Sequence, residues 1–159
     1  MLLENWHITA LDVKTAFLYG KLDEEIYVEQ PEGFKLKGQE DKVLQLYRAI
    51  YGLKQAALAW WKELDQSLQQ LGFKRLYADS GIFVAHHGDG MPIAILAYVD
   101  DILFLGPNSA LLASKKKLFM DQWECRDLGK CKEFLHMRIR YSKGKIYLDQ
   151  VSYLKKVLE

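Results

Sequence analysis

The sequence has few cysteines, few prolines and little net charge. Its 159 residues include two cysteines, Cys125 and Cys131, and three prolines. Two cysteines without further ones around them are typical of reduced thiols in an intracellular protein, not of a secreted disulfide scaffold. Only His136 lies near them as a further ligand, which disfavours a structural zinc-type site. The low proline and glycine content argues against extensive disorder.

The sequence also lacks a signal peptide and a membrane-spanning run. No basic stretch followed by an apolar one occurs at the N-terminus, so we do not expect secretion. The longest apolar stretch, Met91–Leu105, is too short to cross a bilayer, so we expect no membrane partner. The formal net charge is +1, whereas nucleic-acid-binding proteins often have a basic excess. An acidic cluster in the same chain would offset basic charge elsewhere.

Half of the residues are apolar, enough for one domain with a substantial core. Apolar periodicity predicts strands at 6–13, 43–47, 80–86, 91–97 and 102–105, and helices at 53–71 and 109–123. Ser109 is the expected N-cap of the second helix, and residues 22–34 are typical of a loop or small hairpin. A hairpin is expected from Phe134–Tyr141 and Lys145–Leu148, followed by a helix from Ser152. This order indicates an α+β fold, an antiparallel sheet with helices packed on one face.

Two adjacent aspartates interrupt the longest apolar run. Asp100 and Asp101 lie between two segments that both look like buried strands. Adjacent like charges are costly in such a place unless a cation compensates them. A tight turn would bring both carboxylates to the sheet edge, where a divalent cation could neutralise them. The alternative is a plain Asp-rich β-turn without a metal.

A third carboxylate, Asp12, lies near the end of the first predicted strand. If side chains alternate there, Asp12 shares a face with Ile8 and Ala10. It could equally be a helix N-cap or an ion-pair partner. Three carboxylates at strand ends can bind two Mg²⁺ ions, with phosphates and water completing the coordination. Two such ions can stabilise the attacking and leaving oxygens of a phosphoryl displacement.

Several segments resemble the reverse transcriptases of copia-type LTR retrotransposons. The segments similar to the first palm motif are Asp12–Leu18, Leu22–Tyr27 and Gln30–Phe34. Tyr51–Ala56 with Trp60 is similar to the second palm motif, and Tyr98–Asp101 is similar to the catalytic turn. Asp127–Gly129 with Phe134–Leu135 is similar to the region ahead of the primer grip. The order of these matches follows the family over nearly the whole chain, which makes the resemblance specific.

The resemblance implies an RNA-directed DNA polymerase, which joins dNTPs to a primer 3′-OH on an RNA or DNA template. Asp12, Asp100 and Asp101 would be the catalytic residues and would hold two Mg²⁺ ions, or Mn²⁺ in their place. The carbonyl of Val13 would add a further metal ligand.

The resemblance also implies nucleotide-binding and primer-binding residues. Phe17 would be the steric gate that rejects a ribose 2′-OH; the alternative is an ordinary core aromatic. Gln55 would line the nucleotide pocket; the alternative is a solvated residue at a helix start. The residues that would lie at the primer and template are Tyr98, Val99, Phe134, Leu135 and His136.

By the same resemblance, residues 1–133 would be the reverse-transcriptase palm of a right-hand polymerase fold. Residues 134–159 would be the primer-grip hairpin and the start of the thumb or connection. Fingers and thumb would be largely absent, so we expect a fragment of a Pol polyprotein that is inactive alone. Its partners would be the fingers, thumb, RNase H and integrase, in the cytoplasm or a virus-like particle.

Two alternatives stay open at this point. The chain could be a catalytically dead remnant with a binding role or none, or another two-metal phosphotransferase such as a nuclease. A nuclease would need the carboxylates but neither Phe17 nor Gln55. The sequence also departs from the family pattern, with Ala57 in place of a proline and His136 in place of a glycine.

Overall fold

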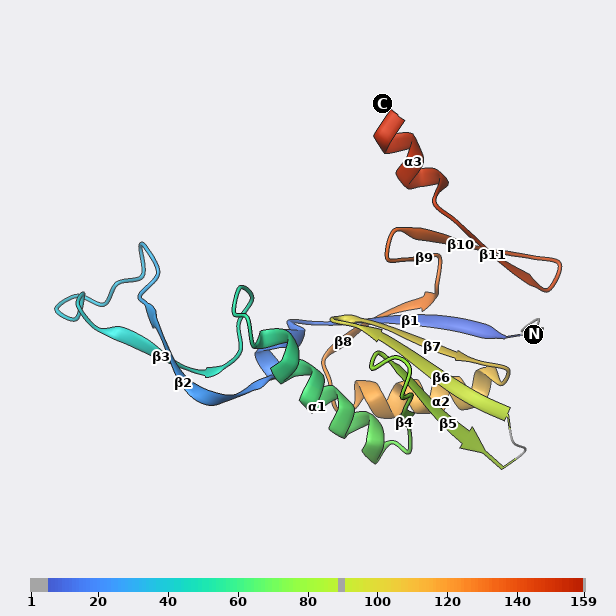
Figure 1. Ribbon diagram of the computed structural model, residues 1–159, viewed down its shortest axis with the longest axis horizontal. Coiled ribbons are helices and arrows are strands. Elements are labelled where there is room, and N and C mark those ends of the chain that lie inside the picture. The colour runs from blue at the N-terminus through green and yellow to red at the C-terminus, as the bar shows by residue number, and fades with distance from the viewer. Residues whose placement is uncertain (1–5, 89–90, 159) are drawn as a thin grey trace. The chain divides into compact units, whose positions relative to one another are not determined.

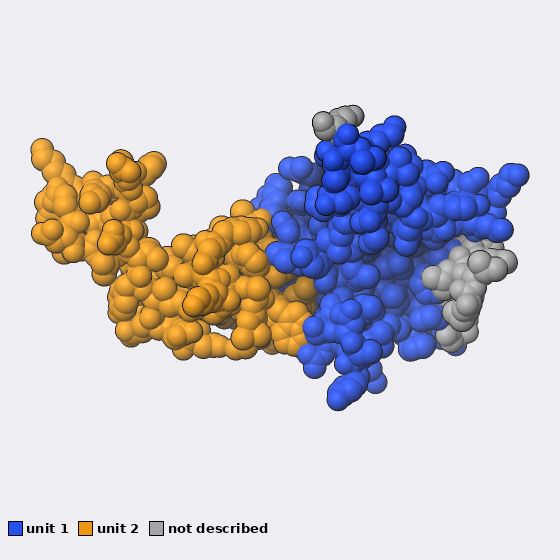
Figure 2. Space-filling view, turned by 45° about the horizontal axis from the view of Figure 1, so that its top comes forward, with its two compact units in different colours: residues 1–14, 67–159 blue, residues 15–66 orange. Residues whose placement is uncertain are grey.

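The computed structural model describes residues 6–88 and 91–158, which form two compact units. Unit 2 is Thr15–Gln66, and unit 1 contains the described residues on either side of it, up to Lys14 and from Ser67 onward (Figure 2). In chain order the elements are β1 (His7–Val13), the 3₁₀-helix η1 (Ala16–Tyr19), β2 (Lys21–Glu29), β3 (Val43–Arg48), α1 (Ala56–Gln70), β4 (Lys74–Arg75), β5 (Ile82–His87), β6 (Met91–Tyr98), β7 (Asp101–Gly106), α2 (Ser109–Met120), β8 (Cys125–Lys130), β9 (Glu133–Phe134), β10 (Met137–Ser142), β11 (Lys145–Asp149) and α3 (Val151–Leu158) (Figure 1).

The centre of unit 1 is a six-stranded sheet with the strand order β4-β5-β6-β7-β1-β8. Each neighbouring pair in it is antiparallel. On one face, Phe104 of β7 meets Phe119 of α2 edge to face, with ring centroids 5.8 Å apart. Both rings are fully buried, and a buried side chain of this size contributes about 1.5–3 kcal/mol. Helix α2 is therefore held on this face by the aromatic core.

A second, three-stranded sheet, β11-β10-β9, covers the opposite face of the main sheet. Its Phe134 and Ile139 form one buried cluster with Ala10 of β1 and Leu103 of β7. The α+β class and the antiparallel pairing predicted from sequence are confirmed. The second sheet on the other face was not predicted, and it lies there because the apolar residues of β9 and β10 pack against β1 and β7.

Unit 2 is built from the β2–β3 ribbon and the start of α1, joined by a close backbone approach at Gly20. A Cβ on Gly20 would lie 2.8 Å from the backbone nitrogen of Trp60, so only glycine fits. Arg48 secures the same region by donating to the carbonyl of Tyr19 at 2.8 Å. In this unit the expected loop or small hairpin at 22–34 is wrong. Lys21–Glu29 is one strand, because it pairs with β3 from Val43 onward.

Two further expectations need correction. The N-cap of α2 is Asn108, not Ser109, because Asn108 has extended backbone angles and its side chain accepts from Leu111 N. The segment expected as one strand, Phe134–Tyr141, is split by a turn at Leu135 and His136 into β9 and β10. Within the part of the chain that the structure describes, no helix is long and apolar enough to cross a membrane.

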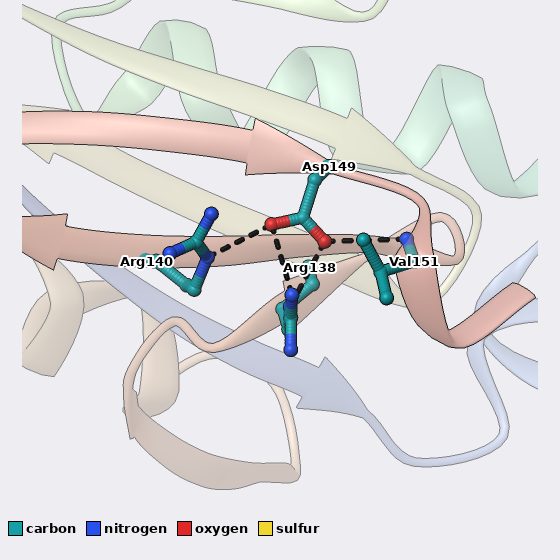
Figure 3. A network of polar contacts seen from close by, with 4 residues as sticks. All are labelled: Arg138, Arg140, Asp149 and Val151. Carbon is teal, nitrogen blue, oxygen red and sulfur yellow. Dashed lines mark hydrogen bonds and ion pairs between the residues drawn. The ribbon is translucent and has the colours of Figure 1, made fainter.

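One carboxylate ties β10, β11 and α3 together (Figure 3). Asp149 accepts from Arg138 Nε at 2.9 Å and from Arg140 Nε at 2.8 Å. The backbone N–H of Val151, the first residue of α3, also donates to it at 3.2 Å. The two guanidinium groups lower the pKa of Asp149 to about 2. Ionised Asp149 therefore links the hairpin to the start of the helix.

We expect Asp149→Asn to lower the midpoint of thermal unfolding, because the variant loses charge-assisted bonds to two arginines. The pKa of this carboxyl is lower in the folded state than in the unfolded state, so its contribution is complete above about pH 4 and disappears as the pH falls towards about 2. Unfolding of both proteins between pH 2 and 7 tests this. A constant difference across that range would contradict it, and Asp41→Asn, a carboxylate between β2 and β3, is the control.

Candidate functional site

The pairing of β1 with β7 brings the predicted carboxylates to one end of the sheet. Asp12 is the cross-strand partner of Asp101, and Val13 N donates to the carbonyl of Asp100 at 2.8 Å. Paired residues on neighbouring antiparallel strands project from the same face. Alternation also places Asp12 on the face of Ala10, as expected from the sequence. The structure therefore brings Asp12 close to Asp100 and Asp101, which are far from it in the chain.

The electrostatics agree with this proximity. The pKa of Asp101 is raised, first by partial burial and then by the charges of Asp100 and Asp12. On the neighbouring strand, burial and then Asp12 and Glu124 raise the pKa of Cys125 to about 11. This thiol stays protonated at neutral pH and is a poor nucleophile. The site is thus electronegative and suited to a cation.

The turn between β6 and β7 holds a strained backbone. Val99 has φ 55°, in the left-handed region that β-branched residues rarely adopt. Strain of this kind concentrates at functional sites, where surrounding structure holds it in place. Tyr98, the partner of Asp101 across the turn, is 55% exposed. The turn thus presents an aromatic side chain next to the two aspartates.

The carboxylates are oxygen donors of the kind that Mg²⁺ binds. Mg²⁺ prefers oxygen ligands and usually takes only one or two carboxylates from the protein. Among residues 6–88 and 91–158, no group of three or more His, Cys, Asp or Glu side chains is already arranged to hold a metal ion. Carboxylates without a cation between them repel one another. The strand register thus brings the three carboxylates to one end of the sheet, but their oxygens do not surround a common metal position.

Sequence reasoning missed one charged residue of this row. Arg126 of β8 is the cross-strand partner of Asp12, so β7, β1 and β8 place Asp101, Asp12 and Arg126 side by side. A guanidinium near carboxylates reduces their mutual repulsion. The sequence signal was weak, because β8 is a polar edge strand without an apolar alternation.

Three of the predicted primer-binding residues also lie together. Tyr98, Phe134 and Leu135 line one apolar cavity of about 390 Å³ in unit 1. Phe134 is buried and Leu135 is 38% exposed. This cavity extends from the β6–β7 turn to the β9–β10 turn, and the primer-binding roles of these residues stay predictions.

The β9–β10 turn has two consecutive residues in the left-handed region. Leu135 has φ 50° and His136 has φ 63°, and they connect the paired residues Phe134 and Met137. Two-residue hairpin turns of this kind favour glycine and asparagine. The departure from the family pattern at His136 thus has a physical cost, because a glycine adopts this conformation without a Cβ clash.

The two predicted nucleotide-binding residues belong to unit 2. Phe17 packs against Tyr51, with ring centroids 4.5 Å apart, and against an alanine-rich buried cluster. Gln55 precedes α1, where its carbonyl accepts from Ala59 N and its side chain donates to Glu24 at 3.2 Å. Both positions also suit the structural alternatives, a core aromatic and a helix-start residue, so both roles stay predictions.

Comparison with known proteins identifies the class of this chain. The model of the family described as reverse transcriptase (RNA-dependent DNA polymerase) matches residues 2–159. The chain therefore belongs to the reverse transcriptase family. No solved structure gives a significant match.

The relatives narrow this class to copia-type retrotransposons. The chain is 37% identical over 154 residues to the retrovirus-related Pol polyprotein from transposon TNT 1-94 of Nicotiana tabacum, covering 96% of the chain and 12% of that protein. It is 37% identical over 149 residues to the Pol polyprotein from transposon RE2 of Arabidopsis thaliana, covering 94% and 10%. It is 39% identical over 147 residues to a putative transposon Ty5-1 protein of Saccharomyces cerevisiae, covering 92% and 47%. The chain thus spans a small part of the first two relatives and about half of the third.

We expect His136→Gly to stabilise unit 1 by about 0.5–1 kcal/mol, because it removes the strain of a side chain in the left-handed region. Chemical denaturation of the two proteins measures the difference. The matched control is His86→Gly in β5, where an extended backbone gains nothing from glycine and stability should fall. A loss of stability in His136→Gly would show that the imidazole makes contacts that outweigh the backbone strain.

Proposed function

We propose that this chain carries the nucleotidyl-transfer centre of a copia-type reverse transcriptase, with residues 1–133 as its palm and residues 134–159 as the primer-grip hairpin and the start of the thumb or connection. The observation that supports this most directly is the β1–β7 register, which places Asp12 opposite Asp101 at the turn that carries Asp100. Under this proposal the substrates are dNTPs and a primer on an RNA or DNA template. The remaining regions of a Pol polyprotein would be its partners.

The mechanism assigns a separate task to each part of unit 1. Asp12, Asp100 and Asp101 would hold two Mg²⁺ ions, with the Val13 carbonyl as a further ligand. When bound, these ions supply charge stabilisation at the attacking and leaving oxygens of an in-line displacement. The β6–β7 turn fixes the spacing of Asp100 and Asp101 relative to Asp12. Tyr98 and the β9–β10 turn would orient the primer strand, and such positioning provides much of the rate in phosphoryl transfer.

A nuclease would use the same carboxylates, so the site residues outside them distinguish the two activities. The proposal assigns nucleotide selection to Phe17 and Gln55 of unit 2, for which a nuclease has no use. The match over residues 2–159, which includes all of unit 2, also favours the polymerase.

We expect Asp100→Asn and Asp101→Asn to reduce primer extension by several orders of magnitude, because each removes a charged metal ligand. The assay is Mg²⁺-dependent extension of a labelled primer in the complete Pol polyprotein. Folding should survive, because each variant removes one of several crowded like charges, and burial together with Asp100 and Asp12 already raises the pKa of Asp101. Asp41→Asn, an exposed carboxylate between β2 and β3, is the control. Wild-type extension in either variant would exclude the catalytic role.

We expect Phe17→Ala to relax discrimination against ribonucleotides, because a ring that blocks a 2′-OH acts by steric exclusion. Competing dNTP and rNTP incorporation in the same polyprotein measures the ratio. Tyr19→Ala is the matched control, since Tyr19 is also a partly buried aromatic of unit 2 and packs on Trp60 at 5.9 Å. If Phe17→Ala and Tyr19→Ala leave the same ratio as the wild type, Phe17 is a core residue only.

A further inference from the structure

Unit 1 contains a second, larger cavity of about 630 Å³. Its walls come from the start of β1, from α2, from the end of β8 and from the turn between β10 and β11. The cavity extends along β1 as far as Thr9, whereas Asp12 lies three positions further along the same strand. At about 3.3 Å per residue, this is roughly 10 Å along the strand. The cavity is therefore distinct from the carboxylate site.

Four lysines line this cavity: Lys116, Lys130, Lys143 and Lys145. Among the described lining residues there is no aspartate or glutamate. Further polar side chains in the lining include His7, Tyr141 and the hydroxyls of Thr9, Ser109 and Ser142. A concave surface with one sign of charge focuses its field and attracts ligands of the opposite sign. The lining therefore favours an anion.

The lysines differ in how far their charges are already compensated by interactions within the protein. Lys116 donates to Asp127 at 2.8 Å and to Thr9 Oγ1 at 3.1 Å, so its charge is largely compensated. Lys130 lies over the ring of Tyr141, 3.8 Å from the centroid. Within the described residues, Lys143 and Lys145 have neither an ion pair nor a side-chain hydrogen bond. Their charges, at the exposed β10–β11 turn, are available to a ligand.

The opposite wall adds polar and aromatic groups. Helix α2 begins at Ser109, which lines the cavity, and the N-terminus of a helix carries a partial positive charge. Trp6, partly exposed, lines the same cavity and offers an aromatic surface. Ammonium groups and hydroxyls can contact phosphate oxygens, and an aromatic ring can stack on a base. The lining therefore has the groups that bind a ligand with both a phosphate and a base.

We propose that this cavity binds the phosphate groups of a nucleotide or of a single-stranded nucleic acid, with Lys143 and Lys145 as the principal contacts. The site is separate from the metal-binding carboxylates and needs no divalent cation. Phosphates carry the negative charge that the lining lacks, and hydroxyls can donate to their oxygens. Phosphate binding at this cavity depends on the cavity and its charges alone, so it does not require polymerase activity.

The test is binding to the 159-residue chain in EDTA at low salt, with three probes: inorganic tripolyphosphate, dTTP and a short oligothymidylate. We expect the amide resonances of Thr9, Ser109 and Gly144 to shift in NMR titrations, while those of Gly33 and Gly38 in unit 2 do not. Tighter binding of the oligonucleotide than of dTTP would identify nucleic acid as the source of the phosphates. Tighter binding of dTTP would identify a nucleotide. Absence of shifts at the cavity with all three probes would overturn the proposal.

The decisive variant is the double substitution Lys143→Glu/Lys145→Glu, which should weaken binding about tenfold or more, since it reverses two charges at the site. Lys35→Glu/Lys37→Glu is the matched control, with the same spacing and charge change in unit 2. An equal loss in both variants would show unspecific attraction and overturn the proposal. Circular dichroism verifies folding, and Lys143→Gln/Lys145→Gln, which should weaken binding to a smaller extent, replaces the first variant if it does not fold.

Discussion

The register between β1 and β7 is the constraint on which the candidate site depends. Ala10 and Leu103 are buried against β9 and β10, and this burial fixes how the two strands align. A shift by one residue would turn every side chain of β1 to the opposite face and expose that apolar row. Asp12 and Asp101 are therefore held together by the packing of their apolar neighbours, although their own charges repel. The core provides the energy that keeps the carboxylates in place.

The second sheet has two functions in this arrangement. Its apolar side closes the core over β1 and β7, and its β9–β10 turn carries predicted primer-binding residues that share a cavity with Tyr98 of the β6–β7 turn. Non-glycine residues with left-handed angles, Val99, Leu135 and His136, occur at both turns. Such conformations persist only where neighbouring structure determines them. The strain at the two turns thus depends on the same buried cluster that sets the strand register.

Much of the fold could be predicted from the sequence, because strands β1, β6 and β7 have strong apolar patterns and α1 has a clear helical period. The strand β8 was missed, since an edge strand pairs on one side only and its sequence is polar. Consequently Arg126, which faces Asp12 across that pair, was missed too. The split of β9 from β10 was missed because neither Leu135 nor His136 signals a turn by residue type. The positions of the carboxylates could be predicted because they lie at the ends of apolar strands. Residues paired across a polar edge strand could not be predicted and are seen only in the structure.

Under the proposed function, the division into two units separates the metal-binding residues from the nucleotide-binding residues. The carboxylates, the β6–β7 turn and the β9–β10 turn all belong to unit 1, whereas Phe17 and Gln55 belong to unit 2. Unit 2 has its own buried cluster and its own close approach at Gly20. Under the proposed roles, substitutions that alter how Phe17 packs would change nucleotide selection without disturbing the β1–β7 register. Conversely, a loss of packing beneath β9 would displace the carboxylates while the packing around Phe17 stays intact. Metal binding and nucleotide discrimination should accordingly respond to different sets of mutations.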